Sequence, residues 1–502
     1  MEVKVATDSI TRIKADAIIV NCFEGMERPE DEAATVDEAL GGTITELIKQ
    51  GEIKGKLNQI TVIYSQGKLP ATRVVVTGLG KKEEITPDRV MRAIAGTCRF
   101  LQKKNLKTVA ISTRGAGLAG ITVSDASRAI TEGALLGVYL FRRHITKASE
   151  HGEIEQLTII DGDAGRLSAL EEGSRQGKIM AEAANLARDM VNEPSNYLTP
   201  TDMATIASKL AESHGLEINI LEREQMQAMG MGAILGVSQG SRQPPKFIAL
   251  RYRGSNSAST DIALIGKGIT FDSGGISIKP SEGMGDMKGD MAGGAAVIAA
   301  MGAIAQLKPK INVLAICAAT ENMPDGNAIR PGDVLTAMGG KTIEIISTDA
   351  EGRLTLADAL GYAKKEGAKL LVDAATLTGA MRIALGDICT GAFGNNQELI
   401  DKIIAAGNEA GERIWQMPMY EEYKKQNESD VADIKNVGGR MGGAITAAQF
   451  VGEFAGDTPW VHLDIAGTSM NEKEQNQLPK GATGVPARTL VNLVLALAKE
   501  SG

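Results

Sequence analysis

Short apolar runs alternate with amphipathic stretches along the first third of the chain. β-branched and apolar residues predict strands at 15–20, 60–64, 73–77, 108–112 and 157–160. Apolar residues at helical spacing predict helices at 36–50, 87–103 and 124–141. Strands that alternate with helices are typical of an α/β layer architecture. We therefore expect a smaller N-terminal α/β domain over residues 1–165.

The alternation resumes after a long helical stretch and a loop rich in helix-breaking residues. Residues 166–195 form the predicted connecting helix and linker, and 196–502 the larger domain. Strands are predicted there at 217–222, 246–252, 261–266, 311–318, 342–347, 369–374 and 460–465. Several of these runs are almost entirely apolar, which is typical of strands buried on both faces. The pattern predicts a central mixed, mainly parallel sheet flanked by helices.

Composition narrows the class of protein. A chain of 502 residues exceeds one typical core, which agrees with two domains. The net charge of −8 disfavours nucleic acid and anionic membranes as partners. The four cysteines show no CxxC spacing, so we interpret them as buried thiols in a reducing compartment. The charged N-terminus lacks the apolar core of a signal peptide, and the apolar stretch 295–305 is too short to cross a bilayer. A cytoplasmic location is expected.

Glycines and charged residues gather directly after one predicted strand. Nine glycines lie between Gly266 and Gly294, and they surround a set of charged residues: Lys267, Asp272, Lys279, Asp286, Lys288 and Asp290. Open α/β sheets bind ligands at the carboxyl ends of their strands. The alternative interpretation is a solvated surface loop with incidental charges.

A second charged group favours the ligand site. Asp349, Glu351 and Arg353 follow another predicted strand and, in an extended segment, would point to the same side. Two neighbouring carboxylates repel each other unless a cation or a shared proton lies between them. With Asp272 and Asp290 they supply up to four negative charges, which is enough for two divalent ions. There are four histidines and no HExxH motif; a carboxylate site suits Mn²⁺ or Mg²⁺, with Zn²⁺ as an alternative.

These segments resemble the leucyl aminopeptidases, also called cytosol aminopeptidases. The stretch Thr348-Asp-Ala-Glu-Gly-Arg-Leu is similar to the family signature, except that Ser347 stands where the family has asparagine. Further similar stretches begin at Gly266, Asp373, Thr390 and Trp460. The resemblance covers residues 185–495, while the N-terminal third resembles the family's macro-like domain in length and α/β character.

The resemblance implies a set of metal ligands and two catalytic residues. Asp272 and Glu351 would bridge two ions, Lys267 and Asp290 would complete one site, and Asp349 the other. Mn²⁺ is the expected ion, with Zn²⁺, Mg²⁺ or Co²⁺ as alternatives. The catalytic residues would be Lys279, which stabilises an oxyanion, and Arg353, which holds a bicarbonate that carries a proton to the leaving amine.

The resemblance also implies a substrate and an assembly. The enzyme would release N-terminal residues, preferentially leucine and other apolar residues, from peptides with a free amino group. Met287, Thr376 and Gly379 would line the pocket for the first side chain. The family forms homohexamers, and the same assembly is expected here.

The sequence also permits three other interpretations. Gly236-Val-Ser-Gln-Gly fits the GxSxG motif of serine hydrolases, with Ser238 as nucleophile and His462 downstream, but Pro244 and Pro245 follow where a helix should begin. Gly339-Gly-Lys-Thr lacks the leading glycine of a P-loop. A non-catalytic binding protein is the last alternative. Supporting or surface roles are expected for Lys288, Asp286 and Asp358.

Overall fold

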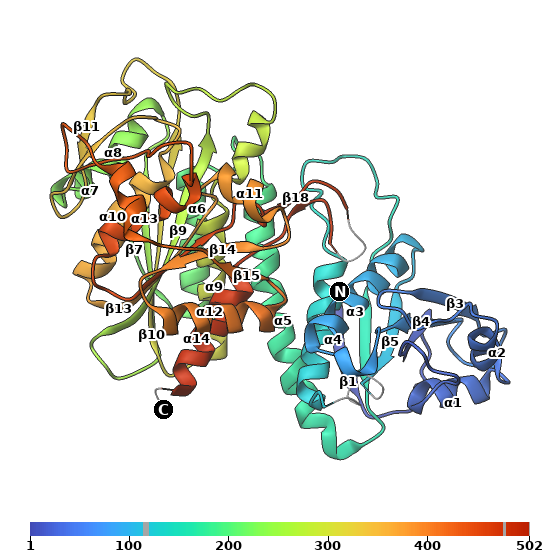
Figure 1. Ribbon diagram of the computed structural model, residues 1–502. Coiled ribbons are helices and arrows are strands. Elements are labelled where there is room, and N and C mark those ends of the chain that lie inside the picture. The colour runs from blue at the N-terminus through green and yellow to red at the C-terminus, as the bar shows by residue number, and fades with distance from the viewer. Residues whose placement is uncertain (114–119, 475–477, 501–502) are drawn as a thin grey trace. The chain divides into compact units, whose positions relative to one another are not determined.

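The chain divides into two compact units in a computed structural model that describes residues 1–113, 120–474 and 478–500 (Figure 1). The first unit comprises Met1–Glu182 together with Lys473–Lys480, and the second comprises Ala183–Glu472 and Gly481–Gly502. Helix α5 (Leu167–Asn192) runs from one unit into the next. The sequence pattern did not predict that residues 473–480 join the first unit. There Glu474 pairs with Arg99 at 2.8 Å.

The first unit contains a six-stranded sheet in the order β1-β6-β5-β2-β4-β3, in which only the β3–β4 pair is antiparallel. Its strands are β1 Glu2–Ala6, β2 Ala17–Cys22, β3 Ile60–Tyr64, β4 Arg73–Gly78, β5 Thr108–Ser112 and β6 Gln156–Ile160. Helices α3 (Pro87–Lys103) and α4 (Val123–Gly137) pack on one face of the sheet. Helices α1 (Asp31–Ala39) and α2 (Thr43–Lys49) pack on the other.

One predicted helix of this unit is wrong. Residues 36–50 form the end of α1 and all of α2, because Gly41 and Gly42 adopt φ values of 74° and 83° that interrupt the helix. Strand β1 was not predicted. The other predicted strands and helices of this unit lie within a few residues of the observed ones, and the α/β character is confirmed.

The second unit is built on an eight-stranded sheet in the order β15-β14-β17-β13-β9-β10-β8-β7. The four central strands β17, β13, β9 and β10 run parallel, and antiparallel pairs join β7 to β8, β8 to β10 and β14 to β17. The strands are β7 Glu217–Leu221, β8 Lys246–Arg253, β9 Thr260–Asp272, β10 Asn312–Asn322, β13 Ala368–Ala375, β14 Thr390–Gly394, β15 Ile414–Gln416 and β17 Trp460–Asp464. The predicted mixed, mainly parallel sheet is confirmed.

Helices cover both faces of this sheet. On one face lie α6 (Pro200–His214), α9 (Ala292–Leu307), α12 (Gln397–Ala410) and α14 (Ala487–Glu500). The other face packs against α8 (Gly232–Val237), α10 (Gly352–Lys365) and α13 (Gly443–Ala455). The remaining elements are α7 Arg223–Ala228, α11 Gly379–Leu385, β11 Val334–Thr336, β12 Thr342–Glu344, β16 Ile434–Lys435, β18 Met470–Asn471 and β19 Gly481–Ala482.

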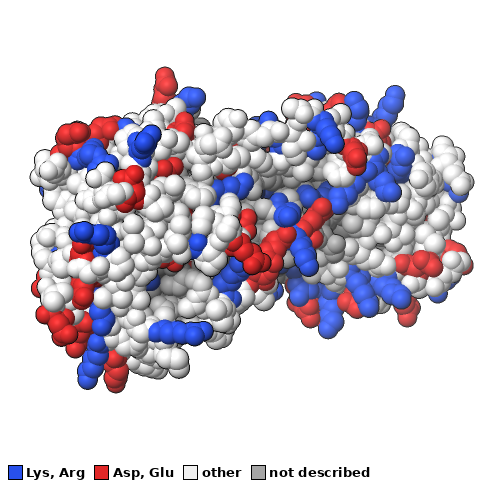
Figure 2. Space-filling model, turned by 90° about the horizontal axis from the view of Figure 1, so that it is seen from above, with Lys and Arg blue, Asp and Glu red and all other residues white. Residues whose placement is uncertain are grey.

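One helical stretch of the described residues, Met284–Leu307, is long and apolar enough to cross a membrane. It includes α9, and 89% of its most apolar window is buried inside the structure. Its position in the core of the second unit accounts for its composition. On the face in Figure 2, Lys and Arg side chains are interspersed with Asp and Glu side chains on both units. One exposed ion pair of the second unit joins Arg253 and Glu217 at 2.7 Å.

Asp358 is a buried carboxylate that joins three segments of the second unit. It lies in α10 and accepts hydrogen bonds from the backbone N–H groups of Ile234, at 2.8 Å, and Met338, at 2.7 Å. Burial raises the pKa of Asp358 to about 7, and the backbone donors only partly oppose this rise. Asp358 therefore has a structural role away from the carboxylates near Asp272.

The raised pKa predicts a pH dependence of stability. The folded pKa of about 7 lies above the unfolded value of 3.8, so the folded state holds an extra proton between these values. The free energy of unfolding then falls as pH rises through this window, by up to about 1.4 kcal/mol per pH unit. We expect Asp358→Asn to lack this decline when both proteins are unfolded in denaturant at pH 5, 6 and 7. Parallel pH profiles for the two proteins would contradict the assignment.

Candidate metal site

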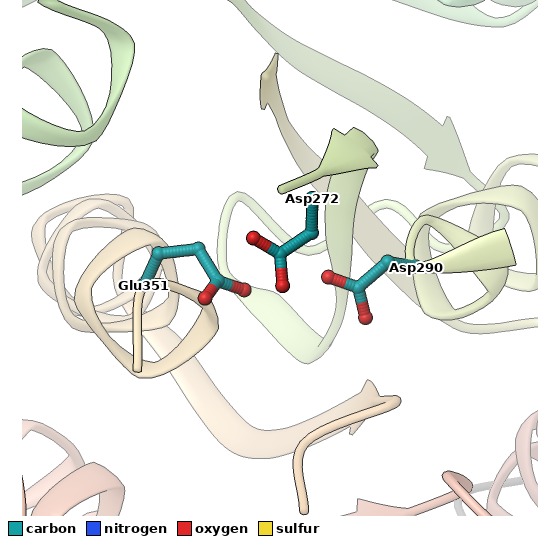
Figure 3. A group of neighbouring side chains, drawn as sticks. All are labelled: Asp272, Asp290 and Glu351. Atoms are coloured by element: carbon teal, nitrogen blue, oxygen red, sulfur yellow. The ribbon is translucent and has the colours of Figure 1, made fainter. Parts of the chain in front are cut away.

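Three buried carboxylates converge at the carboxyl edge of the eight-stranded sheet. Asp272 ends β9, Asp290 lies between the 3₁₀ helix η5 (Met284–Gly289) and α9, and Glu351 directly precedes α10. One carboxylate oxygen of each lies within 4.8 Å of the others. Figure 3 shows the three side chains pointing toward one another from separate elements. The fold thus concentrates negative charge at one buried point.

Lys267 lies among these carboxylates. Its Nζ is 2.8 Å from Asp290 Oδ2 and 2.8 Å from Glu351 Oε1, and it donates a hydrogen bond to the carbonyl of Thr376. Burial alone would lower the pKa of Lys267, but the negative charges of Asp290 and Glu351 outweigh burial and raise it. The ammonium group is therefore the counter-charge of the cluster. A divalent cation would replace that charge and free the amine to act as a ligand.

A second lysine reaches the cluster from the loop after β9. Lys279 Nζ lies 2.8 Å from Asp272 Oδ2 and also pairs with Asp349. Burial would lower the pKa of Lys279, but the charge of Asp272 and the hydrogen bonds to both carboxylates raise it. Lys279 therefore stays protonated beside the carboxylates. Burial also raises the pKa of Asp349.

Three oxygens of the cluster form no hydrogen bond of regular geometry with the described residues. Among the described residues, both oxygens of Glu351 and Oδ2 of Asp290 are buried and accept no hydrogen bond, although Lys267 is within ion-pair distance. Burial, followed by the charge of Asp272, raises the pKa of Glu351, and burial raises that of Asp290. Buried carboxylates without donors are costly unless a cation satisfies them. Oxygen ligands with one amine nitrogen fit Mn²⁺, Mg²⁺ or Zn²⁺.

Arg353 offers a donor beside the carboxylates. Its Nη1 donates to the carbonyl of Asn436 at 2.6 Å, while its Nε is buried and has no partner among the residues described. Burial lowers the pKa of Arg353 to about 10, and the nearby carboxylates Glu351 and Asp464 oppose this. A buried guanidinium N–H without a partner is suited to an anion.

Two glycines let the helices approach β9 closely enough to form the cluster. A Cβ atom on Gly352, the first residue of α10, would lie 2.7 Å from Lys267 Nζ and 2.5 Å from its Cε. A Cβ atom on Gly293, in α9, would lie 1.9 Å from the carbonyl oxygen of Ala374 in β13. A side chain at Gly293 would push α9 away from the sheet, and one at Gly352 would displace the side chain of Lys267.

The residues predicted to line a substrate pocket lie on three neighbouring segments. Met287 belongs to η5, and its carbonyl accepts the N–H of Asp290 at 3.3 Å. Thr376 follows β13, and its hydroxyl donates to Asp290 Oδ1 at 2.7 Å. Gly379 begins α11, and a Cβ atom there would meet nothing within 4 Å. Thr376 therefore contacts a member of the cluster, and Gly379 borders open space.

Two details of the sequence interpretation are wrong. Strand β9 continues to Asp272, so Lys267 lies inside the strand and not in a loop after it. The segment 347–353 is not extended, because it turns at Thr348 and Asp349, and Glu351 has helical dihedral angles of −79° and −33°. The cluster forms because the turn and the start of α10 place Glu351 over Lys267.

The serine hydrolase alternative does not fit the structure. Ser238 follows helix α8, is completely buried, and donates its hydroxyl hydrogen to the carbonyl of Leu235 at 2.7 Å. His462 is buried in β17, where its Nδ1 lies 2.5 Å from Asp373 Oδ1. His462 is therefore a hydrogen-bonded strand residue. The Ser238 hydroxyl is buried and hydrogen-bonded, so it cannot act as a nucleophile on a substrate. The GxSxG match is coincidental.

Sequence reasoning missed two asparagines that hold the cluster's loops. Asn322 donates from Nδ2 to Asp272 Oδ1 at 2.8 Å and to the carbonyl of Thr348 at 2.9 Å. Asn436 donates from Nδ2 to the carbonyl of Ser347 at 2.7 Å. Neither residue is charged, and only their positions, Asn322 at the end of β10 and Asn436 directly after β16, could have suggested a role.

The fold and the cluster define a two-domain α/β protein with an enclosed site suited to divalent metal ions. Comparison with known proteins gives the family. The sequence profile for the catalytic domain of the cytosol aminopeptidase family matches residues 185–491, and that for its N-terminal domain matches residues 19–147. The chain belongs to the cytosol aminopeptidase family, a family of metal-dependent aminopeptidases.

Individual relatives match over nearly the whole chain. A protein of Alkaliphilus metalliredigens named "Probable cytosol aminopeptidase" is 46% identical over 501 residues, which are 99% of this chain and 100% of the relative. The structure of a mutant leucine aminopeptidase of tomato is 32% identical, with a TM-score of 0.88 and coverage of 99% and 96% of the two chains. The bottromycin maturation enzyme BotP in complex with Mn is 31% identical, with a TM-score of 0.85 and coverage of 96% and 100%.

The repulsion among the buried carboxylates predicts how Glu351→Gln changes the unfolding temperature. Without metal, the variant should unfold at a temperature equal to or above that of the wild type, because one crowded buried carboxylate becomes neutral. Added Mn²⁺ should raise the unfolding temperature of the wild type, since a ligand at 100 times its Kd adds about 2.7 kcal/mol, and should not raise that of the variant. Differential scanning calorimetry measures both. Glu398→Gln, in which an exposed residue of α12 changes, is the control and should respond to Mn²⁺ like the wild type.

Proposed function

We propose that this aminopeptidase uses two divalent ions to release N-terminal leucine and other apolar residues from peptides. The observation that carries the proposal is the meeting of Asp272, Asp290 and Glu351 around Lys267, with buried oxygens that accept no hydrogen bond from any described residue. The structural match to an enzyme in complex with Mn supports Mn²⁺ as the first ion to test. Zn²⁺, Mg²⁺ and Co²⁺ are the alternatives.

The five ligands of the proposed site are Lys267, Asp272, Asp290, Asp349 and Glu351. Bound there, two divalent ions would supply Lewis-acid activation of a water molecule and of the peptide carbonyl. Asp272 lies near residues of both proposed ion sites, and Glu351 lies beside Asp272 and the residues of one of them. Asp272 pairs with Lys279, which also holds Asp349, and Glu351 pairs with Lys267, which also holds Asp290.

Two cationic side chains complete the proposed mechanism. Lys279 holds its proton and lies beside Asp272 and Asp349, where it can stabilise the oxyanion that forms when water attacks the peptide carbonyl. The buried Nε of Arg353 can donate to bicarbonate. Bicarbonate held there by Arg353 would supply general acid–base chemistry for proton transfer to the leaving amine.

Substrate preference is proposed from the pocket residues and from a neighbour. Met287 is an apolar side chain on the segment that leads to Asp290, and Gly379 leaves open space beside α11. The similar tomato protein is a leucine aminopeptidase. An apolar pocket of this kind would accept a branched aliphatic side chain.

We further propose that the enzyme is a cytoplasmic homohexamer that acts on peptides with a free N-terminus and binds neither membranes nor nucleic acid. The nearly balanced content of 54 basic and 62 acidic residues supports the absence of a nucleic-acid surface. Multi-angle light scattering tests the assembly. A mass six times that of the chain is expected, and a monomeric mass would remove the claim.

Hydrolysis of leucine p-nitroanilide tests the activity. Chelator-treated protein should lose activity and regain it with Mn²⁺, while N-acetyl-leucine p-nitroanilide should remain uncleaved because its amino group is blocked. Glu351→Ala should reduce kcat by about a hundredfold or more, because loss of a residue that only orients a ligand already costs about 10- to 100-fold, and should leave the circular dichroism spectrum unchanged. Cleavage of the acetylated compound at the same rate, or resistance to chelators, would sink the proposal.

The open space beside Gly379 allows a direct test of the pocket. Gly379→Leu should fill this space without disturbing the fold, because a Cβ atom there meets no neighbour within 4 Å. We expect kcat/KM for leucine p-nitroanilide to fall on the order of tenfold. The value for alanine p-nitroanilide should fall much less, because its side chain is smaller. Equal losses on both substrates would show that Gly379 does not line the pocket.

A further inference from the structure

Asn322 is a buried neutral side chain that touches two parts of the metal site at once. It is the last residue of β10 and only 2% exposed. Its Nδ2 has two N–H groups, and both are used: one bonds Asp272 Oδ1 at 2.8 Å and the other the carbonyl of Thr348 at 2.9 Å. Thr348 directly precedes Asp349 in the turn that leads to Glu351. One amide thus links the end of β9 to the loop before α10.

An irregularity of the sheet brings Asn322 opposite Asp272. Along β9 and β10 the parallel register runs regularly to the pair Ile269–Thr320, and then shifts so that Phe271 pairs with Glu321 and Asp272 with Asn322. Thr270 is the extra residue in β9. Without this bulge Asn322 would face Phe271, and its amide would have no carboxylate to bind. Bulges that re-aim a side chain are frequent beside functional sites.

The bond from Asn322 to Asp272 constrains which oxygen of Asp272 is available. Asp272 Oδ1 accepts from Asn322 and from the backbone N–H of Gly274, at 2.9 Å. Oδ2 is left to face Lys279. The carboxylate therefore has a fixed rotation about its χ2 angle, with one oxygen held by the protein and the other directed to the charged cluster.

We propose that Asn322 is a positioning residue of the metal site: it orients Asp272 and holds the loop that carries Asp349 and Glu351. This inference rests on the proposed function, since it assigns Asn322 to the same site. Outer residues that orient metal ligands typically change metal affinity by about 10- to 100-fold when removed. The end of β10 is also held by bonds that do not involve this side chain, because Ser273 donates its N–H and its hydroxyl to the carbonyl of Asn322.

The same strand offers a matched control. Asn312 is the first residue of β10 and 3% exposed, and its Nδ2 donates to the carbonyls of Ser257 and Ser259 at 2.7 and 3.0 Å. It is thus an equally buried asparagine with two side-chain bonds to acceptors, at the amino end of the strand that ends in Asn322. Asn312→Ala should lower stability as Asn322→Ala does and leave the metal site intact.

Metal binding by the full chain tests the proposal. Wild type, Asn322→Ala and Asn312→Ala are stripped with chelator, and Mn²⁺ binding is measured by isothermal titration calorimetry together with the metal-free unfolding temperature. We expect both variants to lose similar stability, but only Asn322→Ala to bind Mn²⁺ about 10- to 100-fold more weakly. Its kcat/KM for leucine p-nitroanilide should recover in part at high Mn²⁺ concentration. Should Asn322→Ala not fold, Asn322→Ser, which keeps one donor, takes its place.

The outcomes separate the two proposals. The role of Asn322 is overturned if Asn322→Ala, or Asn322→Ser in its place, binds Mn²⁺ as tightly as the wild type. It is also overturned if Asn312→Ala loses as much Mn²⁺ affinity as the Asn322 variant. A wild-type protein that binds Mn²⁺ but does not cleave leucine p-nitroanilide overturns the proposed function and leaves the comparison of the variants valid. A wild-type protein that binds no Mn²⁺, Zn²⁺, Mg²⁺ or Co²⁺ overturns both.

Discussion

Repulsion between three buried carboxylates is the constraint on which the second unit depends. Asp272, Asp290 and Glu351 are buried, and they offer oxygens within 4.8 Å of one another. Such a group persists only with compensating positive charge. Lys267 and Lys279 supply it from the same strand and the loop that follows. The two lysines are therefore part of the cluster, because their positive charges offset the repulsion among the three carboxylates.

The rigid sheet keeps the charged side chains of the cluster in place. Three parallel strands end side by side, so Asp272, Asn322 and Thr376 reach the cluster from fixed positions. Thr376 binds Asp290 and Lys267, while Asn322 binds Asp272. Side chains that are placed by strands vary little in position, because each strand is held by its neighbours on both sides. The charged groups can then remain crowded without separating.

Much of this arrangement could be predicted from the sequence, and the reasons for the failures are specific. Strand β3 and helix α3 have the predicted bounds, because their apolar patterns are unambiguous. The charged members of the cluster stood out beside apolar strands and matched a family signature. Asn322 did not, since a neutral residue at a strand end carries no signal, and its contact with Asp272 depends on a bulge that periodicity does not reveal. The turn at 348–349 was hidden because alternating polar residues fit an extended strand equally well.

The close approach at Gly352 and Gly293 has a consequence for the history of the sequence. Only glycine fits at both positions, because the Cβ atom of any other residue would lie too close to Lys267 or Ala374. A substitution there would disturb the cluster while leaving every ligand unchanged. A descendant of this protein could thus lose its metal chemistry and still retain all its acidic and basic residues. For judging whether a distant relative is still an enzyme, these two glycines are as informative as the ligands.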